Sequence, residues 1–348
     1  MDGRRFNRYR QGSGTGCRAT FAGKKTPQIM NAIAEIMKYE TAGDPVSGCK
    51  WTRKTTGKIA RQLERMGIGV SANTVGRLLK KMDYSLRKNL KSLESGLRNP
   101  PAPHQRDQQF RYIRSQIQDY AAHGLPVISV DTKSRELIGP FHQPGRRWCQ
   151  QPIAVLDHDF PSDAKGVAIP YGIYDFCLNE GFVNLGTSRD TAEFAVASIR
   201  NWWQMIGAVK YPNADHLLIL ADCGGSNGYR TRLWKHQLQV AFADRFNLCV
   251  KVCHYPPGTS KWNPIEHRMF SFISNNWAAH PLTDYETVLK FIRTTKTSTG
   301  LKIRAALHTK QYQKGIRICD KQLKEINLKH YTQRQNWNYS ISPVKNVN

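Results

Sequence analysis

The chain has 348 residues and carries 52 Lys and Arg against 26 Asp and Glu, which gives a net charge of +26. Its 40% hydrophobic and 10% aromatic content is that of a globular protein and excludes a wholly disordered chain. Such an excess of positive charge favours a nucleic acid partner, because neutralising phosphates releases condensed counterions. General electrostatic stickiness is the alternative explanation.

Membrane insertion and secretion are not indicated. No apolar run reaches the length of a membrane span, and no apolar segment follows the basic N-terminus. The eight cysteines are scattered and form no C-x-x-C pair. We therefore expect reduced thiols in a cytosolic setting, without a disulfide framework or zinc site.

Composition divides the chain into four regions. Residues 1–25 read as a basic flexible arm, residues 26–98 as a helical region, residues 99–109 as a Pro-rich linker, and residues 110–348 as alternating strands and helices. Within the second region, apolar spacing predicts a helix over Thr26–Tyr39.

Two short helices are predicted within Trp51–Leu86, and they resemble a helix-turn-helix. Thr55 or Thr56 opens the first helix, Gly67 breaks it, and Ser71 caps the second. The outward side chains of the second helix, which we predict to contact DNA, are Asn73, Thr74, Arg77 and Lys81. A plain helical hairpin with a solvated basic face is the alternative. The first hundred residues, with 21 Lys and Arg against 7 Asp and Glu, favour DNA binding.

Two apolar runs predict buried strands, and an aspartate closes each. Pro126–Val130 is followed by Asp131, and His216–Ala221 is followed by Asp222. The other predicted features are an irregular segment at 132–170, a hairpin at Glu180-Gly181, a helix over Asp190–Ile206, a helix over 229–243, a strand over Asn247–Val252, and a tail at 280–348 that packs on the sheet as helices and loops.

A third carboxylate, Glu266, lies in the first turn of a later helix. Asn263 suits its N-cap and Pro264 its first position. The apolar positions predicted to face the core are Ile265, Met269, Phe272, Ile273 and Trp277. An ordinary capping box made by Asn263 and Glu266 is the alternative to a functional role.

The three carboxylates form the candidate site. The carboxyl ends of strands are where ligands gather in open α/β sheets. Carboxylates that converge there without matching cations repel one another unless a metal neutralises them, and oxygen ligands suit Mg²⁺ or Mn²⁺. A pair of such ions supports in-line phosphoryl transfer. The alternative is that Asp131 and Asp222 only cap turns.

Basic residues near these carboxylates in the sequence are predicted to contact DNA: Lys133, Arg146, Arg147 and Lys261. The Gly-rich turn after Asp222 lacks both nucleotide-binding fingerprints, which argues against a nucleotide site.

Five motifs resemble the Rhodopirellula-type DDE transposases of bacterial insertion sequences, a group similar to the mariner-like transposases. They are S-V-D-T at 129–132, I-P-Y-G-I-Y-D at 169–175, D-T-A-E-F-A-V at 190–196, A-D-C-G-G-S-N-G at 221–228 and C-H-Y-P-P-G-T-S-K-W-N-P-I-E-H-R at 253–268. The resemblance implies a ribonuclease-H-like catalytic domain, with a mixed sheet flanked by helices, behind an all-α helix-turn-helix region.

The resemblance also implies an activity. Asp131, Asp222 and Glu266 would be the catalytic triad and would bind two Mg²⁺ or Mn²⁺ ions. The protein would cleave and join DNA at the terminal inverted repeats of an insertion sequence, as a homo-oligomer on double-stranded end and target DNA, in the bacterial cytoplasm at the nucleoid.

Two alternatives stay open. Members of the group usually carry a further helix-turn-helix ahead of the matched region, whereas this chain begins in a Gly/Arg-rich segment. The chain could therefore be a catalytically inactive or truncated DNA-binding remnant or regulator. A ribonuclease-H-like nuclease that hydrolyses without joining would use the same metal site.

Overall fold

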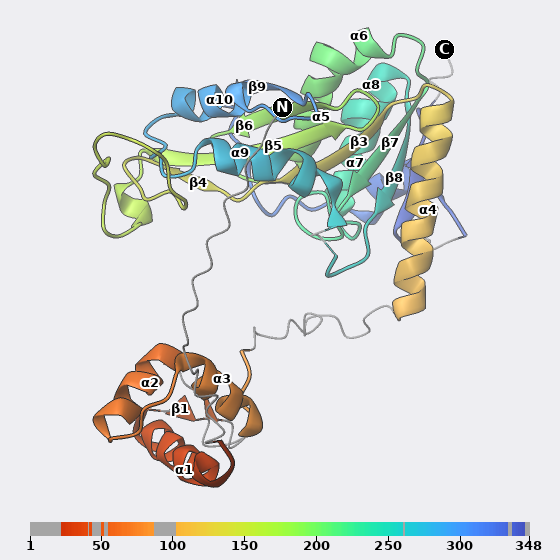
Figure 1. Cartoon of the computed structure of the whole chain (residues 1–348). Helices are drawn as coiled ribbons and strands as arrows, with labels where there is room; N and C mark the ends of the chain where they lie inside the picture. Colours follow the sequence, from red (N-terminus) through yellow and green to blue (C-terminus); the bar gives the residue numbers. More distant parts are fainter. Residues whose placement is uncertain are drawn as a thin grey trace, which may run out of the picture. The chain divides into compact units, whose positions relative to one another are not determined.

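The computed structural model describes residues 22–40, 42–43, 50–51, 55–86, 102–259, 262–332 and 336–344. The chain divides into two compact units, Met1–Lys91 and Ser92–Asn348 (Figure 1). Most of the predicted basic arm lies outside the described residues, but its end at residue 25 overlaps a helix that begins at Ala22.

The first unit is helical. Its elements are α1 (Ala22–Glu40), β1 (Ala42–Gly43), β2 (Lys50–Trp51), α2 (Thr56–Arg65) and α3 (Ala72–Lys81). The buried side chains of Ile33, Ile59, Leu63 and Val75 pack together between the three helices. All three helices predicted from apolar spacing are confirmed.

Both predicted caps of the helix pair are also confirmed. The hydroxyl of Thr55 accepts a hydrogen bond from the Lys58 N–H at 3.3 Å, and that of Ser71 accepts one from the Thr74 N–H at 3.2 Å. Gly67, with a φ of 77°, supplies the left-handed turn between the helices. Met66, which follows the last residue of α2, is 53% exposed.

The second unit opens with α4 (Pro103–Ala122). The predicted linker is therefore wrong from Pro103 onward, because proline is tolerated in the first turn of a helix. Residues Ile113 and Tyr120 of α4 pack against the sheet at Val127 and Leu218.

A mixed sheet of nine strands forms the centre of this unit. The strands are β3 (Val127–Thr132), β4 (Glu136–Ile138), β5 (Gly166–Asp175), β6 (Glu180–Gly186), β7 (His216–Ala221), β8 (Cys249–His254), β9 (Lys302–His308), β10 (Leu328–His330) and β11 (Asn338–Ile341). Their order is β10-β11-β8-β7-β3-β5-β6-β9, and β4 pairs with β5. Strands β3, β7 and β8 are parallel, and β5 is antiparallel to both β3 and β6.

Helices cover both faces of the sheet (Figure 1). Beyond α4 the helical segments are η1 (Pro161–Asp163), α5 (Ala192–Trp202), η2 (Trp203–Gly207), α6 (Ala208–Lys210), α7 (Arg232–Leu238), η3 (Gln239–Ala243), α8 (Asp244–Phe246), η5 (Glu266–Phe270), α9 (Ser271–Asn276), α10 (Tyr285–Thr294) and α11 (Asp320–Lys324). Ile173 and Phe182 pack against α5 and α7, while their neighbours Tyr174 and Val183 pack against η5, α9 and α10. This alternation places one core on each face of the sheet.

Several predicted boundaries are wrong. The irregular segment at 132–170 contains β4, η1 and the start of β5. The hairpin turn lies at residues 176–179, where Asn179 adopts a φ of 51°, and not at Glu180-Gly181, which belong to β6. The tail contributes β9 to one edge of the sheet and β10 and β11 to the other.

The helix after Pro264 also differs in its buried face. Phe272 is 37% exposed, and Phe270 is buried in its place. The reason is that η5 is a π-helical turn, whose wider winding shifts the residues that follow it around the helix axis.

Within the described part of the chain, no helix combines the length and apolar character needed to cross a membrane.

Candidate active site

Asp131 and Asp222 lie side by side at the carboxyl ends of neighbouring parallel strands. Val130 of β3 is in register with Ala221 of β7, so the residues after them reach the same edge of the sheet. Both aspartates are partly buried and line one cleft of about 380 Å³. The structure therefore brings together the two aspartates that the strand pattern predicts.

Glu266 begins the π-helical turn η5, which lies over β5 and β6. Two glycines of these strands allow the close approach. A Cβ on Gly172 would lie 2.5 Å from a ring carbon of Phe270, and one on Gly181 would lie 2.4 Å from the sulfur of Met269. Gly172 is the strand partner of Asp131, so the helix that carries Glu266 crosses next to the first aspartate.

The side chain of Asn263 connects these elements. Its Nδ2 donates a hydrogen bond to Asp222 Oδ1 at 3.0 Å, and its Oδ1 accepts one from the Ser129 hydroxyl. Asn263 is fully buried. The side chain of Asn263 therefore bonds to residues of both strands that carry the aspartates, and a simple capping box does not describe this role. Sequence reasoning missed this function because the partners are far apart in the chain.

Burial and mutual repulsion govern the charges of these groups. Burial, together with the negative charges of Asp222, Glu266 and Asp190, raises the pKa of Asp131 to about 8, against the hydrogen bond from the Thr132 N–H. Burial likewise raises the pKa of Asp222 to about 6, against the Asn263 hydrogen bond and with a contribution from Glu266. Burial also raises the pKa of Glu266, while Lys133 and His267 lower it. The three carboxyl groups therefore lie close enough to oppose one another's ionisation.

A buried hydrogen-bond chain supports the backbone of Asp222. His254 lies 2.8 Å from the Asp222 carbonyl oxygen through Nδ1 and 3.1 Å from the Tyr339 hydroxyl through Nε2. Trp234 Nε1 donates to the same hydroxyl at 2.9 Å. Burial lowers the pKa of His254 to about 4, which keeps the ring neutral. In the tautomer with hydrogen on Nδ1, all three bonds are satisfied in one direction, from Trp234 to Asp222.

Asp190 is a fourth carboxylate near the site that sequence reasoning did not single out. Its charge acts on Asp131, and its Oδ1 is buried without a hydrogen-bond partner. The motif at 190–196 is the feature of the sequence that could have pointed to Asp190. The sequence alone does not distinguish this aspartate from one that only precedes a helix.

The donor chemistry fits a hard divalent cation. Asp131 Oδ1 accepts from the Thr132 N–H at 2.8 Å and Asp222 Oδ1 accepts from Asn263, which leaves their second oxygens for a ligand. All the candidate ligands are oxygen atoms, as Mg²⁺ and Mn²⁺ prefer. Over the described ranges, however, no three His, Cys, Asp or Glu side chains are gathered as a ready-made metal site, and Glu266 does not line the cleft.

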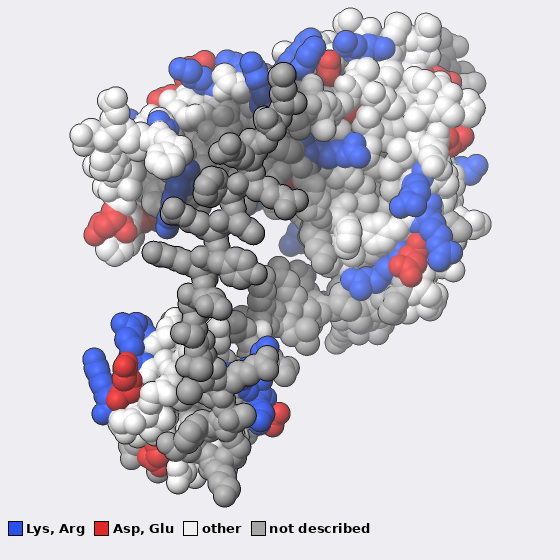
Figure 2. All heavy atoms as spheres, in the orientation of Figure 1, with Lys and Arg blue, Asp and Glu red and all other residues white. Residues whose placement is uncertain are grey.

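The predicted DNA contacts occupy varied environments. Asn73, Arg77 and Lys81 are exposed on α3, whereas Thr74 is partly buried and accepts a hydrogen bond from Arg77. Figure 2 shows basic side chains spread over the visible face of both units, with fewer acidic ones among them.

In the second unit, Lys133 is only 8% exposed, pairs with Glu136 at 2.7 Å and lies 4.4 Å from the centre of the Trp277 ring. The positive charge of Lys133 is therefore already paired inside the protein, which does not favour its predicted role as a DNA contact. Arg146 and Arg147 are exposed on the loop after β4, and Lys261 lies outside the described residues.

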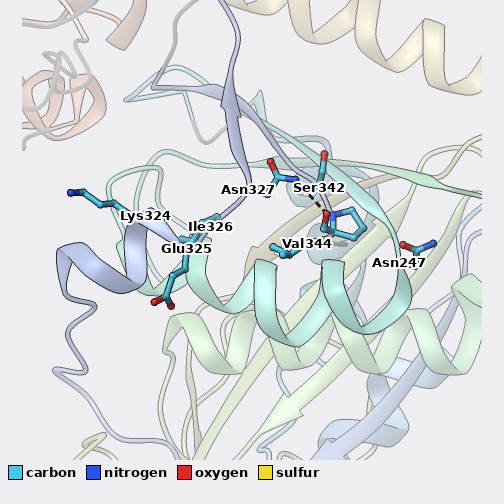
Figure 3. A pocket seen from close by; sticks show the side chains of 8 residues that line it. Asn247, Lys324, Glu325, Ile326, Asn327, Ser342 and Val344 are labelled. Atoms are coloured by element: carbon cyan, nitrogen blue, oxygen red, sulfur yellow. Dashed lines mark hydrogen bonds between the residues drawn. The ribbon is translucent and has the colours of Figure 1, made fainter. Parts of the chain in front are cut away.

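A separate hollow of about 710 Å³ lies where β10 and β11 meet α11 (Figure 3). Its lining includes Asn247, Lys324, Glu325 and Asn327, and Asn327 Nδ2 donates to the Pro343 carbonyl at 3.3 Å. The side chains of Lys324 and Glu325 point away from Asn327 and Ser342 in this view. The hollow contains none of the candidate catalytic carboxylates.

Comparison with known proteins identifies the family. The fold is a mixed α/β sheet flanked by helices, with two aspartates at the ends of adjacent parallel strands. A family model described as the Rhodopirellula transposase DDE domain matches residues 32–343. The chain therefore belongs to the Rhodopirellula-type DDE transposases. Among curated proteins, no match was found.

Similar solved structures are complexes of Mos1 transposase. The Mos1 strand transfer complex is 15% identical, with a TM-score of 0.43, over 82% of this chain and 72% of that chain. The Mos1 paired-end complex with the left transposon end is 14% identical, with a TM-score of 0.40, over 82% and 73%. The Mos1 paired-end complex with Mn is 13% identical, with a TM-score of 0.38, over 84% and 73%.

Proposed function

We propose that this protein is a DNA transposase that cleaves the terminal inverted repeats of an insertion sequence and joins the freed strands to target DNA. The single observation that carries the proposal is the placement of Asp131 and Asp222 at adjacent strand ends in one cleft, with Glu266 acting on both, in a chain of the DDE transposase family. The excess of basic residues suits a DNA substrate.

The second unit is assigned here as a ribonuclease-H-like catalytic domain. The strand order β6-β5-β3-β7-β8, with three antiparallel strands followed by two parallel ones, supports this assignment. In such an open sheet, the carboxyl ends of β3 and β7 form the natural ligand site.

Asp131, Asp222 and Glu266 would hold Mg²⁺ or Mn²⁺, which the donor chemistry fits. Two ions bound there would supply activation of a water or a DNA 3′-hydroxyl and stabilisation of the leaving oxygen in an in-line displacement. The protein's own part is to keep the carboxylates in place: Asn263 orients the Asp222 side chain, and His254 fixes its carbonyl. In the joining step, one phosphodiester bond forms at the 3′-oxygen as the target P–O bond breaks, so the number of such bonds is conserved.

The first unit is proposed to bind the terminal repeats. Its third helix, α3, is the second helix of the predicted helix-turn-helix, and it presents Asn73, Arg77 and Lys81 to solvent, as a recognition helix requires. Arg146, Arg147 and Lys261 are retained as proposed contacts of the catalytic unit with DNA. Action as a homo-oligomer on DNA belongs to the same proposal.

The test is cleavage of a labelled duplex that carries the element's own ends, in Mg²⁺, Mn²⁺ or EDTA. We expect metal-dependent nicking at the ends by the wild type and none by Asp131→Ala or Glu266→Gln. Glu286→Gln is the matched control, because Glu286 also lies in the first turn of a helix but pairs with Arg293 on the surface.

The outcomes separate the alternatives. End binding without cleavage in any metal would establish the DNA-binding remnant and overturn the proposal. Metal-dependent hydrolysis that never yields joined products would identify a nuclease. Cleavage retained by Glu266→Gln would remove Glu266 from the catalytic set.

A further inference from the structure

The wall of the carboxylate cleft carries a positively charged residue that the family resemblance does not assign. The cleft is bordered by the loop after β7, including Gly224, Tyr229 and Arg230. Among the described residues that line the cleft, Arg230 is the one with a positive charge, and it is exposed.

The Arg230 guanidinium is oriented by its neighbour. Its Nε donates a hydrogen bond to the Tyr229 hydroxyl at 2.8 Å, and its central carbon lies 5.0 Å from the centre of the Tyr229 ring. The Tyr229 ring is held in turn by an edge contact with His254, at 6.1 Å between centroids. Arg230 makes no salt bridge with any carboxylate in the described part of the chain. Its two terminal amino groups are thus available for an anion.

The loop that carries this pair is fixed to the site. Asn227 is buried and donates through Nδ2 to the carbonyl of Val130, the residue before Asp131, at 3.5 Å. Gly228 packs so tightly that a Cβ would lie 2.9 Å from the Cys223 carbonyl oxygen. Cys223 donates through its thiol to the Tyr255 carbonyl. Arg230 therefore keeps a defined position relative to Asp131 and Asp222.

We propose that Arg230 binds a phosphodiester group of the DNA strand that enters the cleft, and that Tyr229 positions the guanidinium for it. This inference rests on the proposed function and adds a substrate contact to it. The carboxylates in the cleft repel the phosphates of DNA, so a DNA strand that enters the cleft needs a positively charged side chain beside it as well as the bound metals. Arginine is suited to this because its terminal amino groups bind phosphate oxygens in a bidentate manner.

The occupant is a DNA strand rather than a free nucleotide. The loop contains no G-x-x-x-x-G-K-[ST] or G-x-G-x-x-G sequence for cradling a di- or triphosphate. The cleft is also open along Gly224 and Gly225, both of which are exposed, and this suits a continuing chain.

The experiment combines protein variants with a phosphate scan. Single phosphates near the cleavage position of the labelled duplex are replaced, one at a time, by neutral methylphosphonates, and kcat/KM for nicking is measured with the full chain. Arg230→Ala should lower kcat/KM for unmodified DNA by roughly tenfold to a hundredfold, the worth of a charge-assisted hydrogen-bonded pair. Arg230→Lys should recover part of it, and Tyr229→Phe should show a smaller loss.

At one position, a methylphosphonate should lower the kcat/KM of the wild type as much as the Arg230→Ala substitution does. The same methylphosphonate should cause no further loss of kcat/KM in the Arg230→Ala variant. Arg245→Ala is the matched control, because Arg245 is exposed and also lies over the ring of an adjacent aromatic residue, Phe246, but does not line the cleft.

Each result has a distinct meaning. If the wild type does not nick DNA in any metal, the proposed function fails. If the wild type nicks and Arg230→Ala matches it, or if every methylphosphonate effect is additive with the substitution, the Arg230 contact is refuted. Binding of ATP or inorganic phosphate that is lost in Arg230→Ala, without any change in DNA nicking, would assign the residue to a free phosphate ligand and overturn the proposal.

Discussion

Replacing Asn263 by alanine should weaken metal binding without unfolding the protein. The substitution removes the hydrogen bond from Nδ2 to Asp222 Oδ1 and leaves the Ser129 hydroxyl without its acceptor. A hydrogen bond to a charged group contributes about 1.5–3 kcal/mol. At about 1.4 kcal/mol per factor of ten, this corresponds to roughly 10- to 100-fold weaker affinity, which agrees with the effect of removing other outer-shell partners of metal ligands.

The assay is calorimetric titration of the full chain with Mn²⁺ at pH 8, where Asp222, whose pKa is raised to about 6, is largely ionised. It measures binding directly and does not depend on DNA cleavage. Ser129→Ala should give a smaller loss, because it leaves the bond from Asn263 to Asp222 in place. Asn276→Ala is the control, since Asn276 bonds to Phe291 and Thr294 on the surface. Unchanged Mn²⁺ affinity in a folded Asn263→Ala protein would refute the positioning role.

Three further predictions concern the rest of the molecule. Gly172→Ala should lower the free energy of unfolding by about 1–3 kcal/mol and slow nicking. The reason is that its Cβ would lie 2.5 Å from the Phe270 ring and displace the turn that carries Glu266. Urea unfolding and nicking rates measure the two effects. Burial raises the pKa of Asp175, so the folded protein binds this proton more tightly than the unfolded chain and loses stability as the group ionises above pH 3.8. Asp175→Asn should therefore reduce the fall in the free energy of unfolding over this pH range. Urea unfolding at several pH values tests it. Arg77→Ala should weaken DNA binding and reduce the salt slope of log K by about 1, measured by fluorescence anisotropy.

Matched controls accompany these variants. Gly57→Ala should be tolerated, because nothing lies within 4 Å of its Cβ position. Arg65→Ala, on the last turn of α2, should leave the salt slope nearly unchanged. If Asp175→Asn keeps the wild-type pH dependence, another group is responsible for it, and equal DNA binding by Arg77→Ala and the wild type would contradict the proposed role of α3.

The positions of the two aspartates could be predicted because the signal is local. Each follows a short apolar run that is typical of a buried strand, and the register of β3 with β7 then places both at one edge. Likewise, Thr55 and Ser71 act on N–H groups three residues away, so the helices of the first unit follow from the sequence.

The support of the site could not be predicted because its partners are distant in the chain. Ser129 and Asn263 are 134 positions apart, and His254 and Tyr339 are 85 positions apart. Only the fold shows that these residues meet. The strands of the tail were missed for a related reason: β9 and β10 are edge strands, and whether such short segments pair is decided by the neighbouring strand.

The location of β11 has a consequence for how the protein is made. This strand, Asn338–Ile341, follows all three carboxylates in the chain, lies inside the sheet between β8 and β10, and supplies the Tyr339 hydroxyl that contacts His254. Until β11 has been synthesised and has paired with β8, His254 lacks that partner. A translation product that stops before Tyr339 therefore contains all three carboxylates without the complete support of Asp222.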